Sequence, residues 1–137
     1  MRDFSTPRTF ILSAYKGTAE DATNHADLAC DLALEGAAFR EGEGFYSGKL
    51  EQCFVVVGAR HGETVARLAR EYKQESYLVI AEHDRTAYEV DTKTGFHKCL
   101  GKFVAVDSVK DCEAWTLVDD TYYTTDGRKG VDLPEGL

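Results

Sequence analysis

A tyrosine and a carboxylate, Tyr46 and Glu51, flank a short polar turn over residues 47–49. Phe45 precedes the tyrosine, and beyond Glu51 the chain enters the apolar run of residues 54–57. This pattern predicts a β-hairpin that holds the phenol and the carboxylate near each other across the turn. The pair is the first candidate for a site, although a surface tyrosine and a strand-edge carboxylate would leave the same pattern.

Other groups able to do chemistry are dispersed along the chain. The four histidines (His25, His61, His83 and His97) lie far apart, and the four cysteines include no CxxC pair. We therefore predict no metal site, no cofactor and reduced, structural thiols. His61 is expected on the surface at a helix entrance, and Glu82, His83 and Asp84 read better as a polar turn between strands than as an acid–base cluster. No Walker, GxGxxG, GxSxG or deaminase motif is present.

Composition excludes several classes of protein. The 137 residues carry a formal net charge of −8, with no dense group of Lys or Arg, which argues against nucleic-acid binding. The acidic residues are dispersed among core residues, so solubility explains them better than mimicry of nucleic acid. No apolar run is long enough for a membrane span. The N-terminus lacks a signal-peptide core, which favours the cytoplasm.

Six elements must position the hairpin. Periodicity predicts strands at residues 9–15, 37–46, 52–58 and 76–81, and helices that begin near Asp21 or Thr23 and at Gly62. The first helix should pack its alanines on the sheet and stop at Gly36. The second, over residues 62–73, presents Val65, Leu68, Ala69 and Tyr72 on one face, with a surface pair of Glu63 and Arg67.

The order strand, helix, strand, strand, helix, strand predicts an α+β fold of the ferredoxin-like, split βαβ kind. In it two helices cover one face of an antiparallel sheet, and residues 9–81 form the core of a single domain over residues 1–137. Residues 82–125 should add strands at 85–90, 102–106 and 116–125, with a short helix at 109–114. Residues 126–137 are expected to be a flexible tail.

Several short segments resemble the phage-encoded S-adenosylmethionine lyases, formerly called S-adenosylmethionine hydrolases. Ser13, Ala14 and Tyr15 are similar to the family's Ser-Ala-aromatic end of the first strand, and Gly44-Phe45-Tyr46 is similar to its Gly-x-Tyr element. Glu51 stands where the family has a glutamate before the third strand. Residues 65–69, Gln74 and residues 78–79 resemble its second helix and fourth strand, so the likeness covers about residues 9–90.

The resemblance implies cleavage of S-adenosylmethionine to 5′-methylthioadenosine and L-homoserine lactone by attack of the substrate's own carboxylate. Tyr46 and Glu51 would then line the site, with Glu51 attracting the cationic side of the substrate and Tyr46 near the sulfonium. Ser13, Ala14, Tyr15 and Phe45 would contribute to substrate binding.

The resemblance also implies a PII-like relation and a homotrimer with active sites between subunits, in the cytoplasm of the phage's host. Depletion of the methyl donor would act against restriction. Three alternatives stay open: hydrolysis of the same substrate, a PII-like nucleotide-binding module without catalysis, and a phage protein that inhibits a host enzyme by surface contact.

Overall fold

The computed structural model describes residues 8–46, 48–58 and 61–125. The predicted lead-in before residue 8, Ser47 of the turn and the predicted tail from Asp126 lie outside these residues. Within them the chain forms two α-helices and nine β-strands. In chain order these are β1 (Arg8–Leu12), α1 (Asp21–Leu34), β2 (Ala38–Tyr46), β3 (Lys49–Val57), α2 (Gly62–Glu71), β4 (Ser76–Ala81), β5 (Thr86–Asp91), β6 (His97–Lys102), β7 (Val104–Val106), β8 (Ala114–Val118) and β9 (Thr121–Thr124).

The first six elements follow the predicted order, and β4 has the predicted bounds. β1 ends at Leu12, so Ser13, Ala14 and Tyr15 belong to the segment that leads to α1. β3 begins at Lys49, earlier than predicted, because its pairing with β2 continues to the Tyr46–Lys49 pair at the turn. The hairpin is therefore longer than its apolar residues alone indicated.

α1 packs differently from the prediction. Leu28 and Leu32 are its buried residues, whereas Ala22, Ala26 and Ala33 are exposed. A leucine removes more apolar area from water than an alanine, so the leucine stripe faces the sheet. The predicted cap is also wrong: the N-cap is Glu20, without a side-chain hydrogen bond. The helix ends as predicted before Gly36, which has a φ of +73°.

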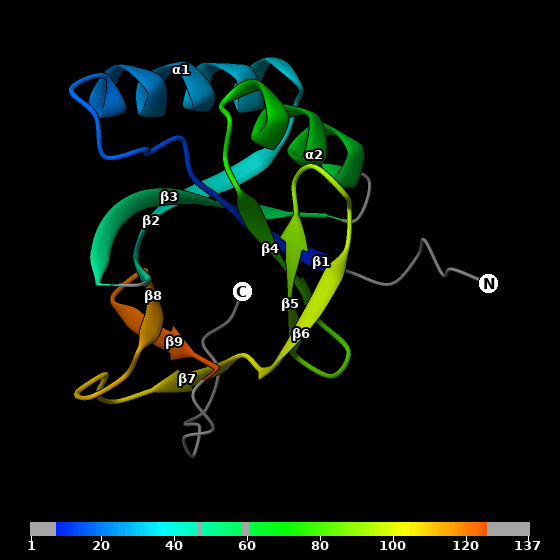
Figure 1. Ribbon diagram of the computed structural model, residues 1–137. Helices are drawn as coiled ribbons and strands as arrows, with labels where there is room; N and C mark the ends of the chain where they lie inside the picture. The colour runs from blue at the N-terminus through cyan, green and yellow to red at the C-terminus, as the bar shows by residue number, and fades with distance from the viewer. Residues whose placement is uncertain (1–7, 47, 59–60, 126–137) are drawn as a thin grey trace.

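α2 buries Val65, Leu68 and Ala69 against the sheet, as its periodicity predicted. The predicted surface pair is replaced, because Arg67 binds Glu71 at 3.1 Å and also Glu35. Both helices cover the same side of the strands that precede β5 (Figure 1). Among the described residues, no helix is long and apolar enough to cross a membrane.

All nine strands join one antiparallel sheet in the order β6-β5-β4-β1-β3-β2-β8-β9-β7. β3 is the middle strand of this order. β1 lies beside it, where Thr9 pairs with Val57 of β3 on one side and with Ile80 of β4 on the other. The two edge strands, β6 and β7, are consecutive in the chain and are separated only by Phe103. The sheet therefore curls until it is nearly closed (Figure 1).

The strands after β4 differ from the prediction. β6 covers a segment that was not predicted as a strand, and the predicted strand at 116–125 is the hairpin of β8 and β9. Asp119 and Asp120, both at positive φ, make its two-residue turn, a geometry that aspartate tolerates. The predicted helix at 109–114 is absent from these described residues, which form turns and the start of β8.

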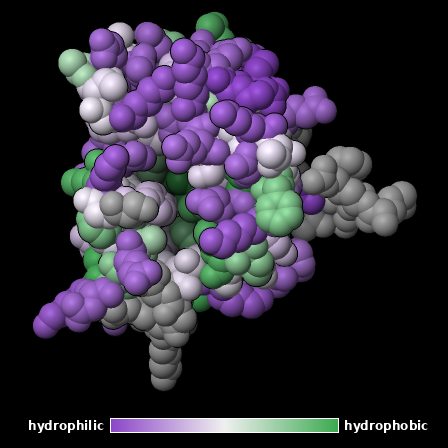
Figure 2. Space-filling view, in the orientation of Figure 1, coloured by the Kyte–Doolittle hydropathy of each residue, from purple (hydrophilic) through white to green (hydrophobic). Residues whose placement is uncertain are grey.

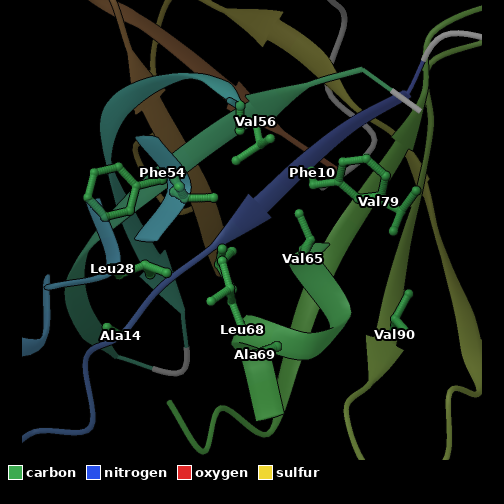
Figure 3. Close-up of a cluster of buried hydrophobic side chains, with 13 residues drawn as sticks. Phe10, Ala14, Leu28, Phe54, Val56, Val65, Leu68, Ala69, Val79 and Val90 are labelled. Carbon is green, nitrogen blue, oxygen red and sulfur yellow. The ribbon is translucent and has the colours of Figure 1, made fainter. Parts of the chain in front are cut away.

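Two hydrophobic clusters lie on the two faces of the sheet. The first is between the helices and the sheet and includes Phe10, Leu28, Phe54 and Leu68 (Figure 3). The second is inside the curled sheet and includes Cys53, Val55, Val118 and Tyr123. Because neighbouring residues of a strand point to opposite faces, β3 feeds both clusters and is apolar almost throughout.

Candidate functional site

The β2–β3 hairpin brings Tyr46 and Glu51 to the same face of the sheet. Tyr46 pairs with Lys49, and Gly44 pairs with Glu51. Paired residues share a face, as do residues two apart on one strand, so these four positions lie on one side. Cys53 follows on the same face and belongs to the inner cluster, so the tyrosine and the carboxylate face the inside of the curled sheet.

Tyr46 is fixed by a glycine and by a neighbouring strand. A Cβ added at Gly44 would lie 2.4 Å from Tyr46 Cε2, so the ring occupies the space that a side chain would need. The Tyr46 hydroxyl is 2.6 Å from Oγ1 of Thr116 on β8. Burial raises the pKa of Tyr46 well above its ordinary value, so its hydroxyl remains protonated near neutral pH.

Glu51 sits in a partly buried and negatively charged environment. Burial raises its pKa, the charge of Asp21 raises it further, and Lys49 lowers it. The neighbouring thiol of Cys53 has its pKa raised to about 12 by burial and by the charges of Glu51 and Glu43. The thiol is therefore protonated near neutral pH, and both burial and the charge of Asp21 disfavour the charged form of Glu51.

The end of β1 approaches the hairpin from the adjacent strand. The Ser13 hydroxyl donates to the carbonyl of Gln52 at 2.8 Å and accepts from the Tyr15 N–H at 3.0 Å. Gln74 donates from Nε2 to the Tyr15 carbonyl at 3.0 Å, which ties the loop after α2 to the same place. Both hydrogen bonds of the Ser13 hydroxyl are thus made to the protein backbone, and they hold the end of β1 beside β3.

Asp21 closes the loop that follows. Its carboxylate accepts from the Lys16 N–H at 2.9 Å and from the Gly17 N–H at 3.0 Å. Burial opposes its charge, but hydrogen bonds from Lys16, Thr18 and Gly17 outweigh that effect and lower the pKa of Asp21. The residue predicted as a helix cap is therefore a fixed negative charge near Glu51.

Two cavities open on the inside of the sheet. The first, which we call the charged cavity, has a volume of about 530 Å³ and is lined by three lysines and three glutamates: Lys16, Lys49, Lys73, Glu51, Glu75 and Glu89. The second, the aromatic cavity, has a volume of about 610 Å³, and its ring-bearing lining includes Phe45, Phe103, Trp115 and Tyr123. Tyr46, Leu78 and Glu89 line both, so the cavities adjoin.

The surface of the molecule is hollowed below the helical layer. Figure 2 shows hydrophobic surface inside this hollow and hydrophilic groups around it. An arrangement of this kind suits an amphipathic small molecule, because polar side chains can fix its orientation while apolar ones bury its body. Carboxylates and an aromatic ring also favour a cationic group over an anionic one at Tyr46 and Glu51.

Most of the predicted site residues come together here. Ser13, Tyr15, Tyr46 and Glu51 line the charged cavity, whereas Phe45 lines the aromatic cavity and stacks on Trp115 with ring centroids 5.6 Å apart. Ala14 lines neither cavity, because it is fully buried in the cluster beneath the helices.

Other predictions for polar residues had mixed outcomes. Residues 82–85 form the predicted polar turn, with His83 on the surface. His61 was predicted on the surface, but it is the N-cap of α2 and only 7% exposed, because it packs over Gly58. Within the described residues, no group of three or more His, Cys, Asp and Glu side chains could hold a metal ion.

Several lining residues were not found from the sequence. Thr116 reaches Tyr46 across a separation of 70 residues, which depends on the pairing of β2 with β8. Lys73 and Glu75 stand in the loop after α2, and Glu89 is on β5. For this loop the sequence offered one indication, Gln74, because it belongs to the segment that resembles the lyases.

The structure thus combines two helices and an antiparallel sheet that is nearly closed, with two adjoining cavities whose lining is partly charged and partly aromatic. The sequence comparison gives this structure a chemical identity: the chain matches the S-adenosylmethionine lyase family over residues 10–126. The protein belongs to that family and is an S-adenosylmethionine lyase. A search of curated proteins found no match to this chain.

Proposed function

We propose that the protein converts S-adenosylmethionine to 5′-methylthioadenosine and L-homoserine lactone in the charged cavity. The observation that carries this proposal is the meeting of Tyr46 and Glu51 in one cavity of a chain that belongs to the lyase family. Both residues are on the face of the hairpin that points into the curled sheet.

The reaction needs no external nucleophile. An oxygen of the substrate's carboxylate forms a bond to the γ-carbon, and the bond from that carbon to sulfur breaks. The electron pair stays on sulfur, which becomes a neutral thioether, and the negative carboxylate becomes a neutral lactone. Charge is cancelled along the path, so a site drier than water favours the step. Holding the chain in a folded conformation can supply an effective molarity of about 10⁵ M or more.

Since the substrate supplies both the nucleophile and the leaving group, the protein needs side chains that bind and orient it. Glu51 would attract the ammonium or sulfonium of the substrate, and the face of the Tyr46 ring would lie near the sulfonium. Neither Tyr46 nor Cys53 is ionised near neutral pH, because burial raises both pKa values. We therefore assign Tyr46 and Glu51 to binding and orientation of the substrate. Ser13, Tyr15 and Phe45 would shape the walls of the cavities.

Product analysis in water labelled with heavy oxygen tests the chemistry. We expect methylthioadenosine together with unlabelled homoserine lactone under mildly acidic conditions in which the lactone persists. Later opening of that lactone by water would label the carboxyl group of homoserine. Label in the γ-hydroxyl group would instead show direct hydrolysis at the γ-carbon and contradict the lyase route. The Glu51→Gln variant, purified in the same way, controls for contaminating enzymes.

The same experiment separates catalysis from binding alone. A nucleotide-binding module of the PII-like kind would bind S-adenosylmethionine saturably and release no methylthioadenosine. The connection between β2 and β3 consists only of residues 47 and 48, which is short for a signalling loop. An inhibitor acting by surface contact would show no effect of the small molecule on its capture of a partner.

We further propose a ferredoxin-like, PII-like relation for the core and a homotrimer. The sheet order β4-β1-β3-β2 with helices after β1 and β3 supports the first. An apolar row supports the second: Leu50 is 55% exposed and pairs with Phe45, which stacks on Trp115, whose ring meets Tyr122. A second chain on this row would lie at the aromatic cavity, which Phe45 and Trp115 line, on the face of the hairpin opposite Tyr46 and Glu51. Mass measurement in solution tests it, and a monomer that turns over substrate would contradict it.

In a host cytoplasm this activity would drain the methyl donor and act against restriction. Expression in a bacterium should lower the cellular pool of S-adenosylmethionine and reduce DNA methylation. Expression of Glu51→Gln at the same level should leave both unchanged. Reduced methylation with the Glu51→Gln variant would contradict the role by substrate depletion.

A further inference from the structure

The loop after α2 contains a lysine where glycine is the usual residue. The C-cap of α2 is Tyr72. The N–H of Lys73 donates to the Arg70 carbonyl at 3.1 Å, and the N–H of Gln74 donates to the Ala69 carbonyl at 2.9 Å. These two bonds make a Schellman motif, in which the residue after the cap adopts a left-handed conformation. Lys73 does so, with a φ of +54°.

That conformation is costly for a lysine, because its Cβ crowds the backbone where glycine has only hydrogen. Five described residues other than glycine have positive φ, and three of them are aspartates, which tolerate it through local hydrogen bonds. Lys73 and Arg85 are the two with long side chains. Glycine would complete the same motif with less strain, so the motif itself does not explain the lysine.

The surroundings of Lys73 supply an explanation. Lys73 is exposed and lines the charged cavity together with Tyr46 and Glu51. Among the described residues, no carboxylate lies within 4.0 Å of its ammonium group. Its neighbour Gln74 binds the Tyr15 carbonyl, which anchors the loop to the wall of the cavity. Within the described part of the chain, Lys73 is therefore a cation without an ion-pair partner, on a backbone that hydrogen bonds hold in place.

The other two lysines of the cavity are engaged differently. Lys49 pairs with Tyr46 across the hairpin, and its charge already acts on Glu51 and lowers the pKa of that carboxyl. Lys16 belongs to the segment whose backbone is bound by Asp21. Lys73 stands in the loop between α2 and β4, and the charges that shift the pKa of Glu51 are those of Asp21 and Lys49.

We propose that Lys73 binds the carboxylate of the substrate's amino-acid moiety. The inference rests on the proposed function of the same cavity and assigns one end of the substrate within it. With the ammonium or sulfonium near Glu51 and Tyr46, the carboxylate needs a cation at a separate point of the wall. An ammonium group can hold one carboxylate oxygen and leave the other free to reach the γ-carbon.

Binding of two ligands tests this assignment. Sinefungin keeps the amino acid and a positive charge in place of the sulfonium but cannot react, whereas methylthioadenosine lacks the amino acid. We expect Lys73→Met to weaken sinefungin binding about tenfold in calorimetry, the size expected for a lost hydrogen bond between charged groups. The affinity for methylthioadenosine should stay unchanged. Lys73→Arg should retain most of the affinity.

The Lys73→Gly variant distinguishes a role in binding from a role in the stability of the loop. It should raise the melting temperature by a few degrees, because the left-handed strain is relieved, while it weakens sinefungin binding as Lys73→Met does. Asp111→Gly is the matched control, since Asp111 has a φ of +67° and lines neither cavity. That variant should leave both affinities unchanged.

Unchanged sinefungin affinity in Lys73→Met, or equal weakening of both ligands, would overturn the assignment. So would a loss of affinity in Lys16→Met that Lys73→Met does not share. The proposed function fails separately: a wild-type protein that binds sinefungin through Lys73 but releases no methylthioadenosine would contradict catalysis and support the binding role.

Discussion

Among single residues, Glu51 is the one whose substitution should affect substrate binding and protein stability in opposite directions. Burial and the charge of Asp21 raise the pKa of Glu51, which lies on the same face of the hairpin as Tyr46. A buried carboxylate without full compensation of its charge is stabilised when a cation binds beside it. We therefore treat Glu51 as the electrostatic centre of the site.

The first prediction concerns the Glu51→Gln variant. Turnover should fall by at least about a hundredfold, because the amide cannot compensate the positive charge of the substrate. The melting temperature should rise slightly near neutral pH. A carboxyl whose pKa is raised by folding destabilises the protein fully above the folded-state pKa, and this cost disappears below the unfolded-state value. Near-normal turnover would remove Glu51 from the site.

The second prediction concerns the acid limb of kcat/KM, which should report the ionisation of Glu51. Activity should fall as the pH drops through its raised pKa. Lys49→Met should move this limb to higher pH, because Lys49 lowers the pKa, and Asp21→Asn should move it to lower pH, because Asp21 raises it. The opposite signs are the test, and shifts in the same direction would contradict the assignment of the limb to Glu51.

At the scale of elements, the β2–β3 hairpin and β8 act together to hold one ring. Gly44 leaves room for Tyr46, and Thr116 of β8 accepts or donates a hydrogen bond at its hydroxyl. Gly44 also pairs with both Glu51 and Thr116 in the sheet. The Gly-x-Tyr spacing thus has a physical basis, since any side chain at the glycine would collide with the tyrosine two residues later.

The third prediction follows from this packing. Gly44→Ala should push the Tyr46 ring from its place, break the bond to Thr116 and lower kcat by more than Tyr46→Phe does, because the phenylalanine keeps the ring. Tyr46→Ala should resemble or exceed Gly44→Ala. Kinetics of the three variants, with circular dichroism to show that the sheet persists, checks the order. Normal activity in Gly44→Ala would show that the position of the ring is unimportant.

At the scale of the whole molecule, the cavities exist because the sheet curls. β7, β8 and β9 continue the sheet beyond β2, and β5 and β6 continue it beyond β4. The two ends of the sheet meet inside: Phe103, between β6 and β7, stacks on Tyr123 of β9 with ring centroids 5.1 Å apart, and both belong to the inner cluster. The strands after residue 81 therefore complete the site as well as the sheet.

The fourth prediction tests this closure. Tyr123 is 1% exposed, so Tyr123→Ala should lower the free energy of unfolding by about 3–5 kcal/mol, the range for large aromatic residues in cores. Leu34→Ala is the control: Leu34 is 85% exposed, and its loss should change stability by less than about 0.5 kcal/mol. Denaturant titration measures both. Equal effects would show that the inner cluster contributes little.

Local pattern was sufficient for the order of the elements up to β4, for the bounds of β4 and for the buried face of α2, which comprises Val65, Leu68 and Ala69. It was insufficient where two patterns competed, as on α1, where the leucines rather than the alanines face the sheet. It also merged β8 with β9, because the aspartates of their turn carry no strong break signal without the pairing.

The order of the core elements, the family likeness and the candidate pair of Tyr46 and Glu51 can be read from the sequence, because they depend on periodicity and on short local motifs. Three features required the folded chain: the near closure of the sheet, the hydrogen bond of Thr116 to Tyr46, and the cavity that Lys73 and Glu89 share with Glu51. Those contacts join segments far apart in the chain. Pairing and burial of the whole sheet set them, and no local pattern encodes either.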